Sequence, residues 1–186
     1  EVVRELRAGV DLLQTNNPDV PARHTSVRAM LASSFRLLAP ESERALGALA
    51  IMRAPFSRET ALAVARADLR ELGQLVDASM IRRVEAGRFA FHPAVRDEAL
   101  ARLSPEQRAP FVQAHAACFL DRLTRSYFDG EDAPEKVWLD RVEPDHLDTL
   151  AAFEAAVRGH DLALVGEAAE PLYRYLFDER EHDLLL

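Results

Sequence analysis

The chain has 186 residues, 48% of them apolar and 29% charged, a composition that is typical of globular protein and sufficient for a buried core. Its formal net charge of -8 disfavours a nucleic-acid-binding protein, because such binding depends on clustered Lys and Arg side chains that neutralise phosphates. The single cysteine, Cys118, excludes an internal disulfide, and no apolar run reaches the roughly 20 residues of a membrane-spanning helix, so we expect a cytoplasmic protein without membrane segments.

The first predicted elements are helices. Apolar residues recur at helical spacing over residues 2–13 and a turn signal follows, so we interpret residues 1–22 as the end of a preceding helical domain and a linker. Helices are then predicted for residues 25–38 and 41–52, and the second of these begins directly after Pro40.

Two shorter helices have clear start signals. Ser57 is placed to cap a helix that begins at residue 58, and Asp68 precedes Glu71 by three residues, as a capping box requires. The second helix is predicted for residues 69–79. Its inner face should consist of Leu69, Leu72, Leu75 and Val76.

From Ile81 the apolar period changes to two, which predicts a small β-hairpin. Its strands would be residues 81–84 and 88–92, with a turn at residues 85–87. Three or four short helices closed by such a hairpin make a winged helix, and we assign this domain to residues 23–104.

Two helices are predicted directly after the hairpin, and the second of them should end at Gly130 and Pro134. Pro93 occupies a first helical position, and Ser104 and Gln107 form a second capping box before a long helix. That helix should bury Phe111, His115, Cys118 and Phe119.

The last two helices are predicted to form an antiparallel pair. The first spans residues 145–158 and should bury Leu147, Leu150, Ala151 and Val157; the second follows Asp161 and should bury Leu162, Val165, Ala169, Leu172 and Leu176. One pair cannot bury both of its faces, so we interpret residues 105–186 as the start of a helical repeat array. The predicted fold is therefore mainly α: a winged helix followed by antiparallel helix pairs of a tetratricopeptide-like superhelix.

His92 is the strongest candidate for a binding residue. It lies between the aromatic strand that ends at Phe91 and the predicted start of a helix at Pro93. An imidazole N–H beside the free amides of a helix N-terminus makes a local anion site. The alternative is that His92 only caps the helix that follows.

Several short stretches, in this order and spacing, resemble the segment that follows the nucleotide-binding core of bacterial STAND-type signalling ATPases, which are relatives of NB-ARC switches. The resemblance covers about residues 1–158. Its main stretches are Arg23-His24-Thr25-Ser26-Val27-Arg28-Ala29-Met30, Ser34-Phe35-Arg36-Leu37-Leu38, Pro55-Phe56, Leu75-Val76-Asp77, Phe91-His92 with Arg96, and Glu143-Pro144-Asp145-His146-Leu147.

The resemblance implies a function in nucleotide sensing. A histidine at the position of His92 would contact the β-phosphate of ADP and hold the resting protein closed. The phosphate-binding loop would lie upstream, and the chain's seven glycines nowhere form G-x-x-x-x-G-K-[S/T], so this chain alone should neither hydrolyse ATP nor bind ADP tightly. Two positions depart from the family pattern: Pro93 replaces an acidic residue, and His146 replaces the usual Asn.

Other candidate sites have simpler interpretations. His115 and Cys118 share a helical face but lack a second ligand pair, so we expect core packing and no metal site. Arg82, Arg83 and Arg88 cluster on the hairpin, where a solvated face explains them. The helix of residues 69–79, which would read DNA in a DNA-binding winged helix, should expose a mixed set that is not basic: Arg70, Glu71, Gln74, Asp77 and Ser79.

Two function hypotheses follow. In the first, the chain is the regulatory segment of a STAND-type signalling or transcription regulator: its winged helix holds ADP against an upstream nucleotide-binding domain, and its helical repeats relay the binding of a protein or small-molecule inducer. In the second, the chain is a protein-interaction scaffold without a nucleotide role. Direct DNA binding is the least favoured alternative because the chain is acidic.

Overall fold

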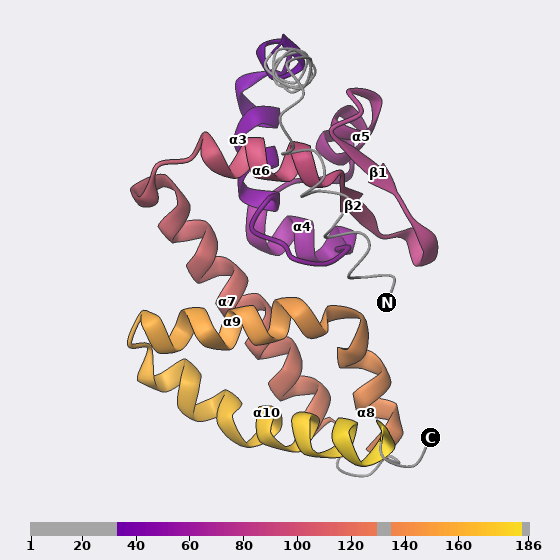
Figure 1. The fold of residues 1–186 in the computed structure, drawn as a ribbon, viewed down its shortest axis with the longest axis vertical. Coiled ribbons are helices and arrows are strands. Elements are labelled where there is room, and N and C mark those ends of the chain that lie inside the picture. The colour runs from indigo at the N-terminus through magenta and orange to yellow at the C-terminus, as the bar shows by residue number, and fades with distance from the viewer. Residues whose placement is uncertain (1–32, 130–134, 184–186) are drawn as a thin grey trace, which may run out of the picture. The chain divides into compact units, whose positions relative to one another are not determined.

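The computed structural model describes residues 33–129 and 135–183 (Figure 1). Residues 40–186 form one compact unit, and the fold given below is that of this unit. The predicted terminal segment 1–22 and most of the predicted helix 25–38 lie outside the described residues. The described chain is mainly helical with one small antiparallel sheet, as predicted.

The elements follow one another closely in both halves of the unit. The first half contains α3 (Pro40–Leu49), α4 (Arg58–Ala65), α5 (Leu69–Asp77), β1 (Ile81–Arg83), the 3-10 turn η2 (Glu85–Gly87), β2 (Phe89–Phe91) and α6 (Pro93–Ala101). The second half contains α7 (Pro105–Phe128), α8 (Glu135–Val142), the 3-10 turn η3 (Glu143–Asp145), α9 (His146–Arg158) and α10 (Leu162–Asp183).

The predicted helix starts are confirmed. The Ser57 hydroxyl accepts from the Thr60 amide at 3.2 Å at the start of α4. Asp68 accepts from the Glu71 amide at 2.8 Å while Glu71 accepts from the Asp68 amide at 2.9 Å, which completes the box that begins α5. The box at Ser104 begins α7 in the same way. Local side-chain caps therefore set these boundaries, because they satisfy amides that have no partner inside the helix.

The hairpin is confirmed and has an additional anchor. In the antiparallel pair, Ile81 lies opposite Phe91 and Arg83 lies opposite Phe89. Phe56, from the loop before α4, exchanges two backbone hydrogen bonds with Phe89, of 2.8 and 2.9 Å. The rings of the two residues are stacked, with their centroids 6.1 Å apart. Phe56 and Phe89 are both buried, so the hairpin is held by the core of the helical bundle as well as by its own short ladder.

The inner face of α5 differs at one predicted position. Leu72 and Leu75 are fully buried, as expected, but Leu69 is 54% exposed. Leu69 is the first residue of α5, where the chain has only just entered the helix. The face that reaches the core begins one turn later.

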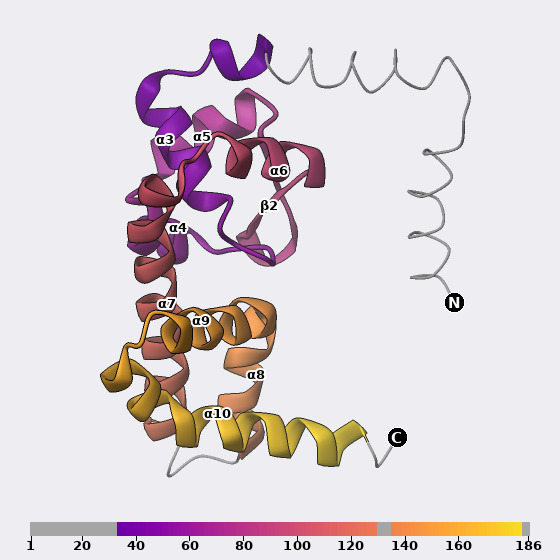
Figure 2. The same cartoon turned by 60° about the vertical axis from the view of Figure 1, so that its left-hand side comes forward.

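In the second half, α7 packs against α9 and α10 (Figures 1 and 2), and the predicted inner faces of α9 and α10 are partly wrong. Leu147, Val157 and Leu162, expected inside, are 53%, 49% and 81% exposed, and Ala169 is also exposed. The buried residues are instead Asp148, Thr149, Ala151, Ala152 and Ala156 on α9, and Ala168, Pro171, Leu172 and Tyr175 on α10. Small alanines allow close approach to α7, and the buried polar groups have partners, which removes the cost of desolvating them.

The same second half contains a helix that the sequence analysis did not predict. The helix α8 is short, and its Trp138 is 4% exposed and packs edge-on against Tyr127 and Tyr175 at 5.5 and 6.2 Å. The Tyr175 hydroxyl donates to Glu143 at 2.9 Å and accepts from His146 Nδ1 at 2.9 Å. This aromatic cluster ties α10 to α7, α8 and the η3 turn.

Candidate functional site

His92 lies at the corner between β2 and α6 and is exposed. Its Nδ1 accepts from the Ala94 amide at 3.3 Å, and its carbonyl accepts from the Val95 and Arg96 amides at 3.0 and 3.1 Å. The interpretation that His92 caps the following helix is therefore confirmed, and nothing in the described structure tests the predicted contact with a phosphate.

The cap has a consequence for the other ring nitrogen. Because Nδ1 accepts a hydrogen bond, the neutral ring carries its proton on Nε2. No described residue binds Nε2 of His92, so an N–H donor is left at an exposed helix N-terminus. Capping and recognition of an anion are thus compatible roles for the two nitrogens of one ring.

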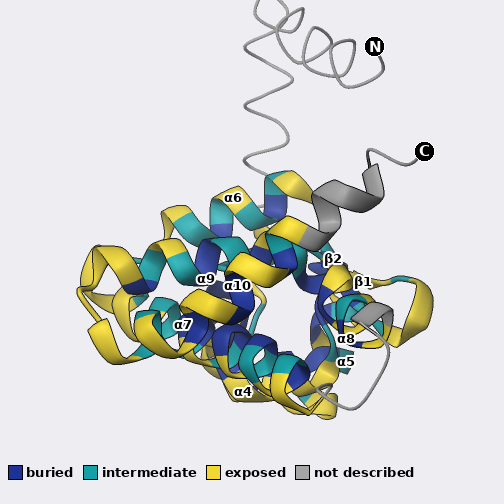
Figure 3. Ribbon diagram, turned by 90° about the horizontal axis from the view of Figure 1, so that it is seen from below, coloured by how far each residue is buried: buried dark blue, intermediate teal, exposed yellow. Residues whose placement is uncertain are grey.

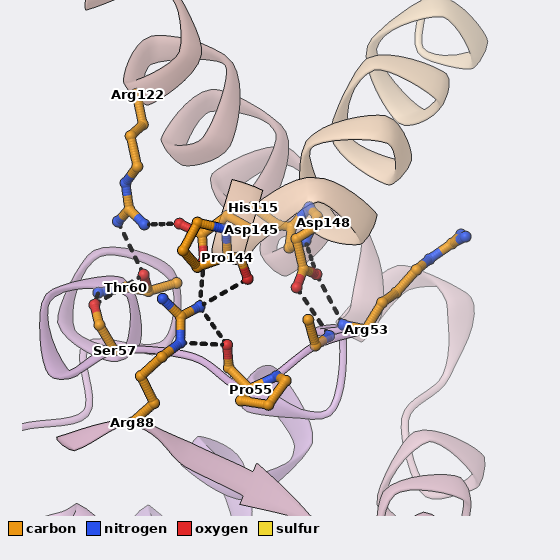
Figure 4. A network of polar contacts seen from close by, with 11 residues as sticks. Arg53, Pro55, Ser57, Thr60, Arg88, His115, Arg122, Pro144, Asp145 and Asp148 are labelled. Carbon is orange, nitrogen blue, oxygen red and sulfur yellow. Dashed lines mark hydrogen bonds and ion pairs between the residues drawn. The ribbon is translucent and has the colours of Figure 1, made fainter. Parts of the chain in front are cut away.

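The most extensive polar cluster of the described residues is centred on two aspartates of the η3 and α9 turn (Figure 4). Asp145 is 3% exposed and binds two guanidinium groups, Arg88 from the hairpin and Arg122 from α7. Arg88 also donates from Nε to the Pro55 carbonyl at 2.9 Å, and Arg122 donates to the Thr60 hydroxyl at 2.9 Å. Each carboxylate oxygen of Asp145 therefore has its own cationic donor, as a buried carboxylate requires.

The second aspartate, Asp148, is 1% exposed and accepts three hydrogen bonds. Its Oδ1 accepts from the Arg53 amide and from His115 Nε2, both at 2.8 Å, and its Oδ2 accepts from the Ala54 amide at 3.0 Å. His115 is itself only 2% exposed. We call Asp145, Asp148 and the residues that bind them the aspartate latch; those partners are Arg53, Ala54, Arg88, His115 and Arg122.

The latch joins the first half of the unit, which contains α3 to α6 and the hairpin, to the helices that follow it. Its donors come from the loop after α3, from the hairpin and from α7, whereas both acceptors lie on the η3 and α9 turn. Because these charges are buried, removing one partner would leave an unpaired charge or donor inside the protein. Relative movement of the two regions at this point would break several such contacts together.

Sequence reasoning located only part of this cluster. His115 is buried as predicted, but its pairing with Asp148 was not anticipated. The interpretation of Arg88 as a solvated residue is wrong, since its side chain is 18% exposed and paired with Asp145. The stretch of residues 143–147 carried the only signal, and it came from the family resemblance, not from any spacing that identifies partners.

Arg96, another residue of the resemblance, has a clear structural role. Its Nε donates to the Met52 carbonyl at 2.7 Å, which fixes α6 to the chain just after α3. Met52 directly precedes Arg53, whose amide binds Asp148. A continuous run of polar contacts therefore leads from α9 through residues 52–54 to α6, whose first turn is capped by His92.

The other residues singled out in the sequence, on α5, α7 and the hairpin, take no part in the aspartate latch. Cys118 is partly buried, and this burial raises the pKa of its thiol, so little reactive thiolate is present at neutral pH. On α5, Arg70, Gln74, Asp77 and Ser79 are exposed and Glu71 is partly so; the set carries both charges. Arg82 and Arg83 are exposed on the hairpin.

No family model, curated protein or solved structure matches this chain. Among the described helices, none combines the length and the apolar character needed to cross a membrane. The function is therefore inferred from the site itself together with the residues that carry the sequence resemblance.

Proposed function

We propose that this chain is the regulatory segment of a STAND-type signalling ATPase. In this role the winged helix, residues 23–104, holds ADP in the resting state through His92, and the helices of residues 105–186 relay the binding of an inducer. The segment contributes no catalytic group. The nucleotide and most of its phosphate donors come from an upstream nucleotide-binding domain of the same protein.

The observation that carries this proposal is the aspartate latch. Asp148 binds the backbone of Arg53 and Ala54, and the adjoining Met52 carbonyl binds Arg96 on the helix that His92 caps. A shift of α9 would therefore be transmitted to the first turn of α6. A relay of this kind couples two sites when each ligand favours a different arrangement of the same element.

The geometry at His92 supports the same role. A neutral ring that accepts through Nδ1 presents an Nε2–H donor beside the amides of a helix N-terminus, which is a suitable contact for one phosphate oxygen. A single donor at an exposed position gives weak binding by itself. It would act as a conditional contact, made when the nucleotide-binding domain presents ADP to it.

The test uses the complete protein with its nucleotide-binding domain. We expect His92→Ala and His92→Ser both to release ADP faster than the native protein, measured as the dissociation rate of a fluorescent ADP analogue. Serine is a good helix cap, so His92→Ser should keep native thermal stability, whereas His92→Ala should lose a little. If His92→Ser retains ADP as long as the native protein, His92 is only a cap and the proposed contact is wrong.

A passive scaffold is the second candidate, and the exposed apolar residues of α9 and α10 favour it. Leu147, Leu162 and Tyr173 are 53%, 81% and 64% exposed, respectively. Exposed apolar side chains of this kind mark interaction surfaces when they cluster. The two candidates differ in the sequence upstream. A phosphate-binding loop in the same reading frame supports the switch, and its absence supports the scaffold.

A further inference from the structure

A groove of about 550 Å³ lies between the hairpin, the loop before α4 and the η3 turn. This volume is within the range of small-molecule sites, which is roughly 300–1,000 Å³. We call this feature the hairpin groove. Its lining includes Arg82, Val84, Glu85 and Arg88 of the hairpin, Pro55 of the loop and Pro144 of the η3 turn.

One face of the hairpin forms most of this lining. Arg82 lies opposite Ala90 in the ladder. The Val84 amide donates to the Arg88 carbonyl at 2.9 Å, so these two residues also lie opposite each other. Because side chains alternate along a strand, Arg82 and Val84 share one face and Arg83 lies on the other. Arg82 is then the diagonal neighbour of Arg88 across the ladder, and two guanidinium groups share the face that borders the groove.

The two arginines differ in their partners. Arg88 donates through Nε and Nη2 to Asp145 and to the carbonyls of Pro55 and Pro144 (Figure 4), but no described residue binds its Nη1. That nitrogen is not one of the buried atoms without a partner, so it is open to solvent. Arg82 is exposed and forms no hydrogen bond or ion pair with any described residue. The groove therefore presents donors from two guanidinium groups, one of which has no anionic partner.

A single carboxylate also lines the groove. Glu85 belongs to the turn of the hairpin, which Figure 3 shows exposed beside β1. No described residue donates to its side chain, and it forms no ion pair with Arg82 although both line the same groove. One unpaired cation and one unpaired anion therefore border the space separately, and Val84, Pro55 and Pro144 supply apolar walls.

We propose that the hairpin groove binds a small zwitterion with an apolar body, an amino acid with an aliphatic side chain. Arg82 and Nη1 of Arg88 would donate to its carboxylate, for which the planar guanidinium is well suited. Glu85 would accept from its ammonium group. The aliphatic side chain would rest against the apolar walls. Both polar contacts are between charged groups, and such hydrogen bonds are about twice as strong as neutral ones.

The charge balance of the groove selects a zwitterion over a simple anion. The charge of Arg88 is already offset by Asp145, which also binds Arg122. The free charges are then one positive, on Arg82, and one negative, on Glu85. A dianion such as phosphate would meet repulsion from Glu85, whereas a molecule with one charge of each sign matches both residues.

The position of the groove connects it to the aspartate latch. Arg88 binds Asp145, and Pro144 directly precedes Asp145 in the η3 turn. A molecule in the groove would therefore contact both halves of the unit. This is a suitable position for a small-molecule inducer, a further step that rests on the proposed function, whereas binding in the groove does not.

The first test compares ligands. The nitrogen-15-labelled 186-residue chain is titrated with L-leucine, and we expect saturable shifts of the backbone amide resonances of residues 82–88. N-acetyl-L-leucine lacks the ammonium group and L-leucinamide lacks the carboxylate, so each should bind about tenfold more weakly or worse, because one charge-assisted contact is lost. Glycine carries both charges but no side chain, and it should also bind more weakly than L-leucine.

The second test compares variants of the chain. Arg82→Gln should reduce the preference for L-leucine over L-leucinamide, and Glu85→Gln should reduce the preference for L-leucine over N-acetyl-L-leucine. Arg83→Gln is the matched control, because it removes the same charge from the adjacent exposed arginine on the other face of β1. Arg82 and Glu85 are exposed and without partners, so their replacement should leave the fold intact.

These measurements need no nucleotide. Saturable shifts with L-leucine, weakened by Arg82→Gln and Glu85→Gln but not by Arg83→Gln, support the site. Absence of saturable shifts at millimolar L-leucine, equal binding of N-acetyl-L-leucine, or equal effects of Arg82→Gln and Arg83→Gln overturns it. ADP retention in the His92 variants bears only on the proposed function, so failure of either proposal can be recognised separately.

Discussion

At the scale of single residues, the buried aspartates are the most consequential side chains of the described chain. Asp145 and Asp148 are three residues apart, yet they bind donors from three other segments. A carboxylate of this kind stabilises the fold only while all of its donors remain in place. His115 depends on Asp148 for a partner, because both side chains are inaccessible to water.

Replacing one of these carboxylates tests their contribution directly. Asp148→Asn preserves the shape but turns one acceptor into an N–H group that faces another donor. We expect the free energy of unfolding to fall by about 2 kcal/mol or more, measured by urea denaturation, because a buried donor left unpaired costs roughly 1–3 kcal/mol. Asp97→Asn, at an exposed position of α6, should change stability by less than about 0.5 kcal/mol. Equal effects of the two substitutions would contradict a structural role for the latch.

Cys118 gives a prediction about reactivity. Burial raises the pKa of this thiol, so the thiolate that reacts with iodoacetamide should be scarcer than at an exposed cysteine of the same chain. In an Ala163→Cys variant, mass spectrometry should show residue 163 alkylated first at pH 8. Raising the pH should accelerate alkylation of Cys118 up to a higher pH than at residue 163. Faster reaction at Cys118 at pH 8 would be inconsistent with this assignment.

At the scale of elements, two glycines behave in opposite ways. Gly73 is inside α5, where a Cβ would meet no atom within 4 Å, so Gly73→Ala should stabilise the protein by about 0.5–1 kcal/mol. Gly87, in the turn of the hairpin, has φ +69°, a left-handed conformation that alanine adopts at a cost of roughly 1–2 kcal/mol. Thermal unfolding of the two variants should therefore shift in opposite directions. A stabilising Gly87→Ala would show that the turn can change its conformation.

The helices α9 and α10 show how an element's orientation depends on its surroundings. The spacing of apolar residues predicts that Leu147 of α9 and Leu162 of α10 are buried, but both side chains are exposed. The buried face contains Asp148 and Tyr175, whose polar atoms find partners on α7 and on the η3 turn. Satisfied polar groups together with small alanines therefore determine how these helices pack.

At the scale of the whole molecule, the latch should make the two halves of the unit unfold together. Trp138 is the only tryptophan and reports on α8 and its neighbours, whereas far-ultraviolet circular dichroism reports on all helices. In the native chain both signals should give one coincident urea transition. In the Asp145→Ala/Asp148→Ala double variant we expect the two transitions to separate. A double variant whose signals still coincide would show that contacts other than the latch join the two halves.

The local features of the fold could be read from the sequence because they depend on neighbours along the chain. The caps at Ser57, Asp68 and Ser104 involve residues three positions apart. The hairpin is indicated by the spacing of apolar residues, which changes to two from Ile81 onward. His92 was identifiable as a helix cap for the same reason. The short helix α8 was not, since its stability comes from Trp138 packing against distant tyrosines.

The sequence alone determined the helical class, the hairpin and the starts of most helices in residues 40–186, because backbone capping and apolar periodicity act over a few residues. Only the tertiary structure decided that Asp145 and Asp148 are buried, that Arg88 binds one of them, and that α10 turns Leu162 and Tyr173 to the outside. A charged group can be buried wherever the fold brings donors to it, and those donors come from residues 23 to 95 positions away in the chain. No local pattern contains that information.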